Sequence, residues 1–331
     1  MIASDLESYR GARVLIVGGL GFIGSNLARR LIALGARVTI MDHMSRKNGA
    51  GLRNFRGVES QVALVMEDIR NVEALKRLVP DVDFLFNLAG QVAYTDSLAD
   101  PQRDFDISCL GHLALLEACR AREARARIVF ASSRMVYRRA PRLPVSEREA
   151  TEPLTIYGIH KLTVEGYHRL YAHNHGLSTL SLRITNPYGP GQRATSGKFG
   201  LVNWFLRLAT EGQPLTVFGD GSQLRDYVFI NDLVEVMLRS ALIKEMKGQV
   251  FNAGRGKGTR FREMADTVVA AAGRGTVQCI PWPENYARFE TGDFVADIGS
   301  LSAEIGYRPA TPLREGLEST LQFYRENGGW D

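Results

Sequence analysis

The sequence predicts an α/β protein built on a doubly wound parallel sheet, followed by a smaller C-terminal α/β domain. Short β-branched apolar runs alternate with helical segments, a glycine-rich turn follows the first run, and the alternation loosens after about residue 180. Strands that are joined through helices pair in parallel, because each crossover covers one face of the sheet.

The first half of the chain supplies the strands and helices of this sheet. The predicted strands are 13–17, 37–41, 62–66, 83–88 and 127–131. Helices are predicted at 25–34, 72–78 and 110–120; in the first of them Leu27, Leu31 and Leu34 recur at helical spacing and Gly35 then favours a stop. Further helices are expected at 199–211 and 261–272.

Composition narrows the function classes. The formal net charge is +5 and the pI is near 9.1, but no basic run is interleaved with aromatic residues, so nucleic acid is not expected as a partner. An excess of arginine suits a phosphate-bearing substrate. Three widely spaced cysteines argue against a disulfide framework or a zinc site, and no metal is expected. No run approaches a membrane span, so we expect a cytoplasmic, soluble protein.

A glycine-rich turn after the first strand indicates a dinucleotide site. Gly18, Gly21 and Gly24 have the spacing G-x-x-G-x-x-G, with Phe22 and Ile23 between the last two glycines. Glycines permit the tight turn and let backbone N–H groups approach a pyrophosphate at the helix N-terminus. These five residues are predicted to bind the cofactor, although a glycine-rich turn can also be purely structural.

Asp42 favours NAD as the cofactor. It ends the second strand 18 residues after Gly24, where a carboxylate can accept both hydroxyls of the adenosine ribose. Its charge would repel the 2′-phosphate of NADP. Arg46 and Lys47 follow closely and offer the alternative of holding that phosphate.

Two further strand ends are predicted to contact the cofactor. Asp68 and Ile69 follow the third strand, where the adenine would lie. Leu88, Ala89 and Gly90 follow the fourth, where small side chains let the cofactor cross the sheet edge. Both segments are also compatible with ordinary turns.

The expected catalytic residues are Ser133, Tyr157 and Lys161. Residues four apart on a helix share a face, so Tyr157 and Lys161 can point to one place, and the cation is expected to lower the pKa of the phenol. Lys161 can also bond the nicotinamide ribose, so we expect Tyr157 and Lys161 to contact the cofactor as well. Ser133 ends the fifth strand and can stabilise charge on the substrate oxygen that Tyr157 deprotonates, unless it merely caps a turn.

Taken together, these motifs resemble the extended short-chain dehydrogenase/reductase family, and within it the nucleotide-sugar epimerase and dehydratase group. The matching segments are 16–24, 87–91, 132–137, 157–161, 182–191 and 217–232. The resemblance implies a Rossmann domain at 1–180 that binds NAD. It also implies a mainly substrate-binding domain at 181–331, with segments near 225–255 returning to the first domain.

The resemblance also assigns the substrate side. It implies a nucleotide-diphosphate sugar whose phosphates meet Asn186 and Arg225, with Ser133 at the sugar. The family's second phosphate-binding Arg is replaced by Glu290, so either Arg288 substitutes for it or the substrate departs from the common uridine-diphosphate sugars. A homodimer is implied, with helices near 110–120 and 162–173 in a four-helix interface.

Departures from the family pattern favour 4-epimerisation through a transient 4-keto sugar. The positions of the dehydratases' Asp-Glu pair hold Arg134 and Met135, which cannot serve as carboxylic acids, and the decarboxylases' Glu is absent. Val17 and Ser108 also differ from common family residues. A dehydratase, decarboxylase or 4-keto reductase stays open, as does a non-catalytic dinucleotide sensor. Arg134 is hypothesised to meet an acidic sugar such as a uronic acid.

Overall fold

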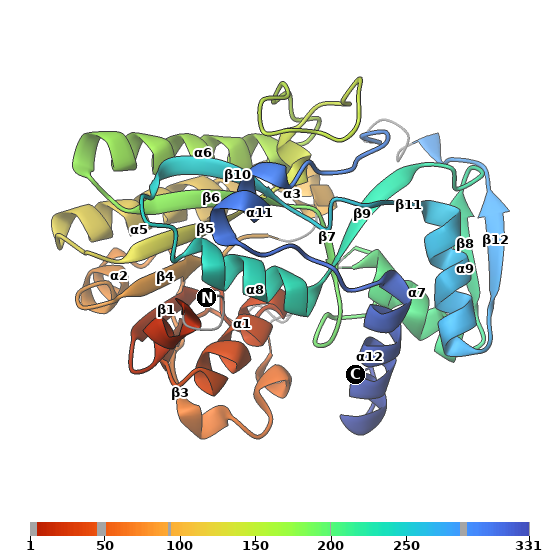
Figure 1. The fold of residues 1–331 in the computed structure, drawn as a ribbon, viewed down its shortest axis with the longest axis horizontal. Coiled ribbons are helices and arrows are strands. Elements are labelled where there is room, and N and C mark those ends of the chain that lie inside the picture. Colours follow the sequence, from red (N-terminus) through yellow and green to blue (C-terminus); the bar gives the residue numbers. More distant parts are fainter. Residues whose placement is uncertain (1–4, 45–50, 92–93, 199, 285–289, 331) are drawn as a thin grey trace.

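A seven-stranded parallel sheet forms the larger part of the molecule, in a computed structural model that describes residues 5–44, 51–91, 94–198, 200–284 and 290–330. The strand order is β10-β6-β5-β4-β1-β2-β3. Their bounds are β1 Arg13–Val17, β2 Arg37–Met41, β3 Val62–Val65, β4 Phe84–Asn87, β5 Arg127–Ser133, β6 Thr179–Ile184 and β10 Lys247–Ala253. The predicted doubly wound sheet is confirmed (Figure 1).

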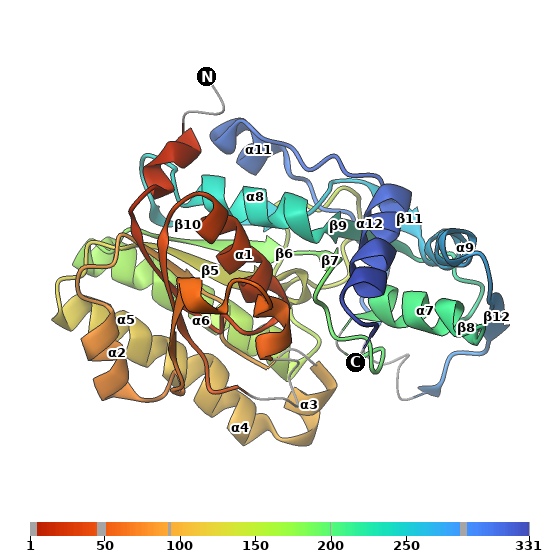
Figure 2. The same ribbon diagram turned by 90° about the horizontal axis from the view of Figure 1, so that it is seen from below.

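Helices cover both faces of this sheet. The helices α1 (Phe22–Ala33) and α8 (Ile230–Ser240) lie on one face, and α2 (Val72–Leu78), α5 (Gly111–Ala121) and α6 (Ile156–His175) lie on the other (Figure 2). The strands show why: Val14 and Ile16 pack in one apolar cluster while Leu15 and Val17 pack in the other, because successive strand side chains point to opposite faces. Burial on both faces accounts for the continuous apolar runs in the sequence.

The smaller part of the molecule follows β6 and carries two short sheets. One has the order β11-β9-β7, with β7 Asn186–Tyr188, β9 Leu224–Phe229 and β11 Gly258–Arg260; the other pairs β8 Pro214–Phe218 with β12 Thr276–Ile280. The helices α7 (Leu201–Thr210), α9 (Phe261–Ala272) and α12 (Leu313–Glu326) pack on them. Figure 1 shows these elements together at the right.

The chain crosses between the two parts more than once. Strand β9 belongs to the smaller part, whereas α8 packs on α1 and β10 pairs with β6 at the edge of the large sheet. The helix α11 (Gly299–Ile305) then packs on α8 and β10. Consequently the carboxyl ends of β5 and β6 lie next to β7 and β9, and residues of both parts meet there.

Local sequence explains where the predicted elements begin and end. The first helix starts at Phe22, three residues before the apolar spacing predicts, because Gly21 caps it in an extended conformation. The fifth strand continues to Ser133 because Ser132 and Ser133 pair with Arg183 and Ile184 of β6. Helices 72–78 and 261–272 have the predicted bounds.

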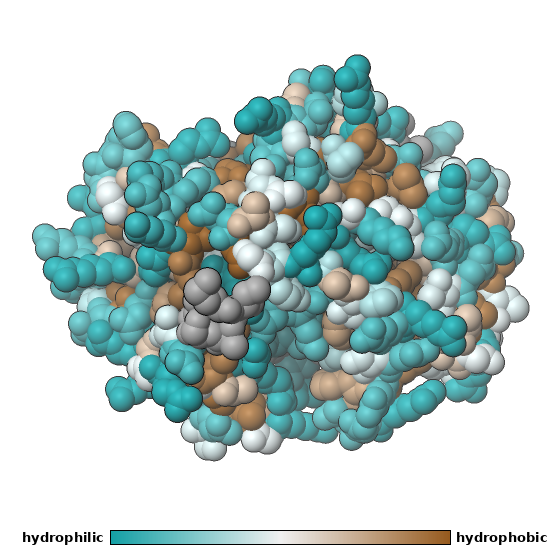
Figure 3. All heavy atoms as spheres, viewed as in Figure 1, coloured by the Kyte–Doolittle hydropathy of each residue, from teal (hydrophilic) through white to brown (hydrophobic). Residues whose placement is uncertain are grey.

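The outer surface is mostly polar. In the view of Figure 3, polar side chains cover most of the face, and apolar ones gather in small separate patches. Among the described residues, no helix combines the length and the apolar character that crossing a bilayer requires.

Two short helices, α3 (Tyr94–Ala99) and α4 (Pro101–Phe105), lead through a π-helical turn at Asp106–Leu110 into α5.

Candidate active site

The glycine-rich turn packs tightly against the end of β4. Gly18 has φ +83°, and a Cβ there would lie 2.7 Å from the backbone nitrogen of Ala89. A Cβ on Gly24 would lie 2.6 Å from the Cα of Gly19, so helix α1 can approach the turn only without a side chain there. Gly21 is the N-cap of α1, and its first N–H groups have no intrahelical partners, which suits an anion.

A groove opens at the carboxyl ends of β1, β2 and β4. Most of the residues predicted to bind the cofactor line it. They are Gly18, Gly21, Asp42, Asp68, Ile69, Leu88, Ala89 and Gly90. Phe22 and Ile23 lie beside it as the first two residues of α1, half-buried against the core. The sequence did not single out Met41, His43, Glu67 and Ile107, which line the same groove.

Asp42 is fixed by the backbone around it. Its carboxylate accepts N–H groups from Leu20 at 3.0 Å and from Met44 at 2.7 Å, and the side chain is buried in the groove wall. Each carboxylate oxygen has a second lone pair, so both can still accept a ribose hydroxyl. Arg46 and Lys47, the alternative ligands for a 2′-phosphate, lie outside the described residues.

Asp68 takes a different role from Asp42 within the groove. Its carboxylate forms a two-point ion pair with Arg70, at 2.8 and 2.9 Å, and these hydrogen bonds hold the pKa of Asp68 below its usual value. Ile69 beside it is buried.

The small residues Ala89 and Gly90 leave the opposite wall of the groove open, and a Cβ on Gly90 would lie 3.7 Å from Nζ of Lys161. The groove therefore leads directly to the predicted catalytic lysine.

Ser133, Tyr157 and Lys161 are brought together as predicted. Tyr157 and Lys161 lie one turn apart on α6, and the Ser133 hydroxyl is close enough to the phenol to act on its pKa. Thr155 caps the helix by accepting the N–H of Gly158 at 3.1 Å. A Cβ on Gly158 would lie 2.3 Å from the carbonyl oxygen of Met135, so a glycine is required where the helix approaches the segment after Ser133.

The pKa of the Tyr157 phenol is shifted upward, whereas the sequence predicts a lowered pKa. Burial raises the pKa of Tyr157 to about 12, whereas the hydrogen bond from Ser133 acts to lower it. The prediction that Lys161 lowers this pKa is wrong for the protein alone. The ammonium donates to the carbonyl of Ala131 at 2.8 Å and lies 5.8 Å from the Tyr157 ring centre. Burial also lowers the pKa of Lys161 to about 8, so it is close to losing its charge under mildly alkaline conditions.

A buried ion pair supports the catalytic strand from behind. Glu165 on α6 pairs with Arg183 on β6 at 2.7 Å, and both side chains are almost fully buried. The Ser132 hydroxyl, next to Ser133, donates to the same carboxylate at 2.5 Å. This network ties α6 to β5 and β6, and sequence reasoning missed it because its members are 18 and 33 residues apart.

A second missed pair lies behind Lys161. The carboxylate of Asp104 is fully buried on α4 and contacts Nδ1 of His160 at 2.5 Å. Its other oxygen accepts the Ser108 hydroxyl at 3.4 Å. The negative charge of Asp104 favours the protonated forms of both Lys161 and Tyr157.

Arg225 and Asn186 lie together where the two parts of the chain meet. Arg225 donates to Glu290 at 2.5 Å and to the carbonyl of Gly292 at 2.8 Å. Asn186 donates from its amide to the carbonyl of Asp226 at 2.9 Å. The neighbouring Asp226 does not pair with Arg225, because its carboxylate accepts N–H groups of Arg255, Gly256 and Ala296. Arg288 lies outside the described residues.

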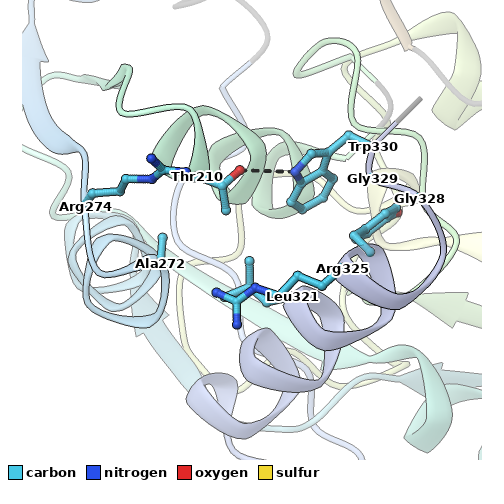
Figure 4. Close-up of a pocket in the computed structure, with 9 residues that line it drawn as sticks. Thr210, Ala272, Arg274, Leu321, Arg325, Gly328, Gly329 and Trp330 are labelled. Carbon is cyan, nitrogen blue, oxygen red and sulfur yellow. Dashed lines mark hydrogen bonds between the residues drawn. The ribbon is translucent and has the colours of Figure 1, made fainter.

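A separate hollow of about 340 Å³ opens between α7, α9 and α12, away from these groups. Figure 4 shows Arg274 and Arg325 extending into it and Trp330 bonded to Thr210 at its rim. None of the predicted site residues lines this hollow, and its described lining includes no carboxylate, cysteine or histidine. The groove that leads to Tyr157 is therefore the candidate active site.

The chain is similar to known proteins over most of its length. Residues 14–254 match the NAD dependent epimerase/dehydratase family. A UDP-glucose 4-epimerase of Mycolicibacterium smegmatis is 30% identical over 319 residues, covering 95% of this chain and 98% of the relative. A CDP-paratose 2-epimerase of Salmonella typhi is 32% identical, covering 94% and 98%. The structure of a Thermus thermophilus UDP-glucose 4-epimerase in complex with NAD superposes with a TM-score of 0.84 at 31% identity, covering 95% and 99%.

Proposed function

Since the chain belongs to the NAD-dependent epimerase/dehydratase family, we propose that it is a nucleotide-sugar 4-epimerase working through a transient 4-keto sugar. The observation that carries the proposal is the closeness of Ser133 to the Tyr157 phenol, on whose pKa the serine acts, with buried Lys161 one helical turn away and no carboxylate on the two residues after Ser133.

The groove fits the cofactor that this family uses. The open N–H groups at the start of α1 suit its pyrophosphate, Asp42 suits an unphosphorylated ribose, and Gly90 leaves space beside Lys161. Bound NAD supplies a hydride acceptor and donor and places a positive charge near the phenol. Asp42, Lys161 and the glycine turn then act as its ligands in this proposal.

The residues of the chain carry the proton chemistry. Tyr157 takes the proton of the sugar C4 hydroxyl when the C4 hydrogen leaves as hydride, and returns it after the keto sugar has presented its other face. Ser133 donates a hydrogen bond to the same oxygen, where negative charge develops. Because burial raises the pKa of Tyr157 to about 12, positive charge close to the phenol is needed for this step.

The described residues next to Ser133 do not supply the groups that removal of water needs. Removal of water requires a separate acid and base beside the sugar. Met135 has no ionisable group and Arg134 is a cation, while Glu290 is engaged with Arg225. A 4-keto reductase would consume reduced cofactor continuously, whereas an epimerase regenerates its cofactor in each cycle. A non-catalytic sensor would not need Ser133, Tyr157 and Lys161 in this arrangement.

The test is product analysis by NMR with a panel of nucleotide sugars. The proposal expects inversion at C4 without net cofactor consumption, and loss of turnover in Tyr157→Phe with cofactor affinity retained. Inversion at C2, as the name of the Salmonella typhi relative states for that enzyme, would reject the assignment of the carbon. Loss of water or of carbon dioxide would reject epimerisation.

We also propose that two copies associate through α5 and α6. Large apolar side chains are exposed along this region, namely Phe105 and Leu110 before α5 and Ile159 and Leu170 on α6. A second copy would cover them by forming a four-helix contact. Light scattering after size exclusion should give twice the chain mass for the unmodified protein and one chain mass for Leu170→Glu.

A further inference from the structure

Arg134 occupies an unusual place beside the catalytic serine. It begins the short 3-10 turn Arg134–Val136 directly after Ser133, and its side chain reaches across to the smaller part of the molecule. There Nη1 donates to the Thr291 hydroxyl at 2.9 Å and Nε donates to the Asn186 side-chain oxygen at 3.4 Å. The guanidinium lies 5.4 Å from the centre of the Phe294 ring. Each of these partners is electrically neutral.

The charges around Arg134 do not balance it. Two acidic groups act on Arg134 without bonding it, Glu290 and Asp226. Glu290 is bound to Arg225 at 2.5 Å and accepts the N–H of Gly292 at 2.9 Å. Asp226 accepts backbone N–H groups of three other residues. Within the described ranges, no carboxylate forms an ion pair with Arg134. Burial and the neighbouring charge of Arg225 lower the pKa of Arg134 to about 10, which leaves it charged at neutral pH.

A half-buried guanidinium without a carboxylate partner is costly unless a ligand supplies the missing charge. We infer that Arg134 binds an acidic group on the sugar, so that the preferred substrate is a nucleotide-linked uronic acid. This inference rests on the proposed 4-epimerase function of the same site.

The connectivity of a pyranose explains why the sugar acid is favoured over the diphosphate. The uronic carboxylate is carried on C5, next to the reacting C4, whereas the diphosphate leaves from C1 across the ring. In the proposed reaction Ser133 meets the C4 oxygen, and Arg134 is the next residue of the chain. Asn186, which accepts a hydrogen bond from Arg134 at 3.4 Å, and Arg225 are the candidates for the diphosphate. A planar guanidinium also matches a carboxylate with two parallel hydrogen bonds.

The test compares substrates that differ only at C6. The NAD-loaded protein is given the uridine, cytidine and thymidine diphosphate forms of glucose and of glucuronic acid, and turnover is followed by NMR. We expect kcat/KM to be higher for the glucuronic acid form. In Arg134→Gln it should fall roughly 10- to 100-fold for the acidic sugar, as expected for one charge-assisted contact, and less than about threefold for the neutral sugar. Arg134→Lys should lie between.

A matched control is Arg138→Gln on the same segment, because Arg138 faces Glu149 and Glu152 at 3.8 and 3.6 Å and lies outside the site. It should change neither rate. Equal loss for both sugars, together with weaker binding of free UDP in Arg134→Gln, would make Arg134 a diphosphate ligand and overturn the inference. A wild-type preference for the neutral sugar would overturn it too.

The two proposals fail in different ways. If no sugar of the panel is epimerised, the proposed function fails. Equilibrium binding of UDP-glucuronic acid and UDP-glucose to wild type, Arg134→Lys and Arg134→Gln then decides the inference alone. It stands if the acidic sugar binds more tightly and loses that advantage only in Arg134→Gln, and it falls otherwise. Thermal unfolding of each variant shows that a loss of binding is not a loss of fold.

Discussion

Replacing Asp42 by Asn tests how the protein selects its cofactor. Asn has nearly the same shape but no charge, so the groove wall is retained while the repulsion of a 2′-phosphate is removed. The carboxylate now accepts N–H groups from Leu20 and Met44. The Asn amide nitrogen cannot accept either of them, so one N–H group loses its partner at a cost of about 1–3 kcal/mol in the free energy of unfolding.

The size of the effect on cofactor choice follows from the position of Asp42. Its side chain is buried, so salt screens it weakly. Two unit negative charges about 4 Å apart repel each other by roughly 4 kcal/mol at an effective dielectric constant of about 20. Since about 1.4 kcal/mol corresponds to a factor of ten, the unmodified protein should prefer NAD over NADP by about 10³-fold.

The assay is calorimetric titration of cofactor-free protein with NAD and with NADP. Asp42→Asn should reduce the preference by about 10²- to 10³-fold, mainly through tighter binding of NADP. The control is Asp68→Asn, because Asp68 lines the same groove but is neutralised by Arg70. Equal affinities of the unmodified protein for both cofactors, or an unchanged ratio in Asp42→Asn, would refute the role given to this carboxylate.

Three further predictions concern the catalytic helix α6. Arg183→Met leaves the buried carboxylate of Glu165 without its arginine partner and should lower the free energy of unfolding, measured in urea, by about 3–5 kcal/mol. The double variant Arg183→Met, Glu165→Leu should regain most of that stability. A loss below about 1 kcal/mol in Arg183→Met would contradict this prediction. Burial lowers the pKa of Lys161 to about 8, so its positive charge is present below that pH and is lost as the pH rises through it. We therefore expect kcat to fall above pH about 8. In Lys161→Arg the fall in kcat should move to higher pH. A kcat that stays constant up to pH 10 would reject the role of the Lys161 charge. Gly158→Ala places a Cβ 2.3 Å from a neighbouring backbone oxygen and should lower kcat at least about tenfold. Gly166→Ala on the same helix meets nothing within 4 Å and should leave kcat unchanged, and equal effects of the two would contradict the argument.

The parts of the fold that follow from local sequence were predictable. Short segments with a clear apolar pattern or glycine spacing predicted strand 13–17, the turn after it and the position of Asp42 at the end of the next strand. The spacing of Tyr157 and Lys161 likewise fixes that both lie on one helix face.

Contacts between distant segments were not predictable in this way. Glu290 meets Arg225 across 65 residues, and Arg134 meets Thr291 across 157, so no window of sequence contains either pair. The direction of the Tyr157 pKa was missed for a related reason. Burial depends on how α6 packs against the segment after Ser133, whereas the sequence shows only that a cation lies one turn away.

The most direct test of the account uses a nucleotide sugar deuterated at C4 and follows its product by NMR in ordinary water. If Tyr157 moves the hydroxyl proton while the C4 hydrogen leaves and returns as hydride, the inverted product retains its deuterium. Tyr157→Phe then gives no product, although it still binds NAD. Loss of the deuterium to solvent, or inversion at a different carbon, would contradict the transient 4-keto sugar on which the proposed function depends.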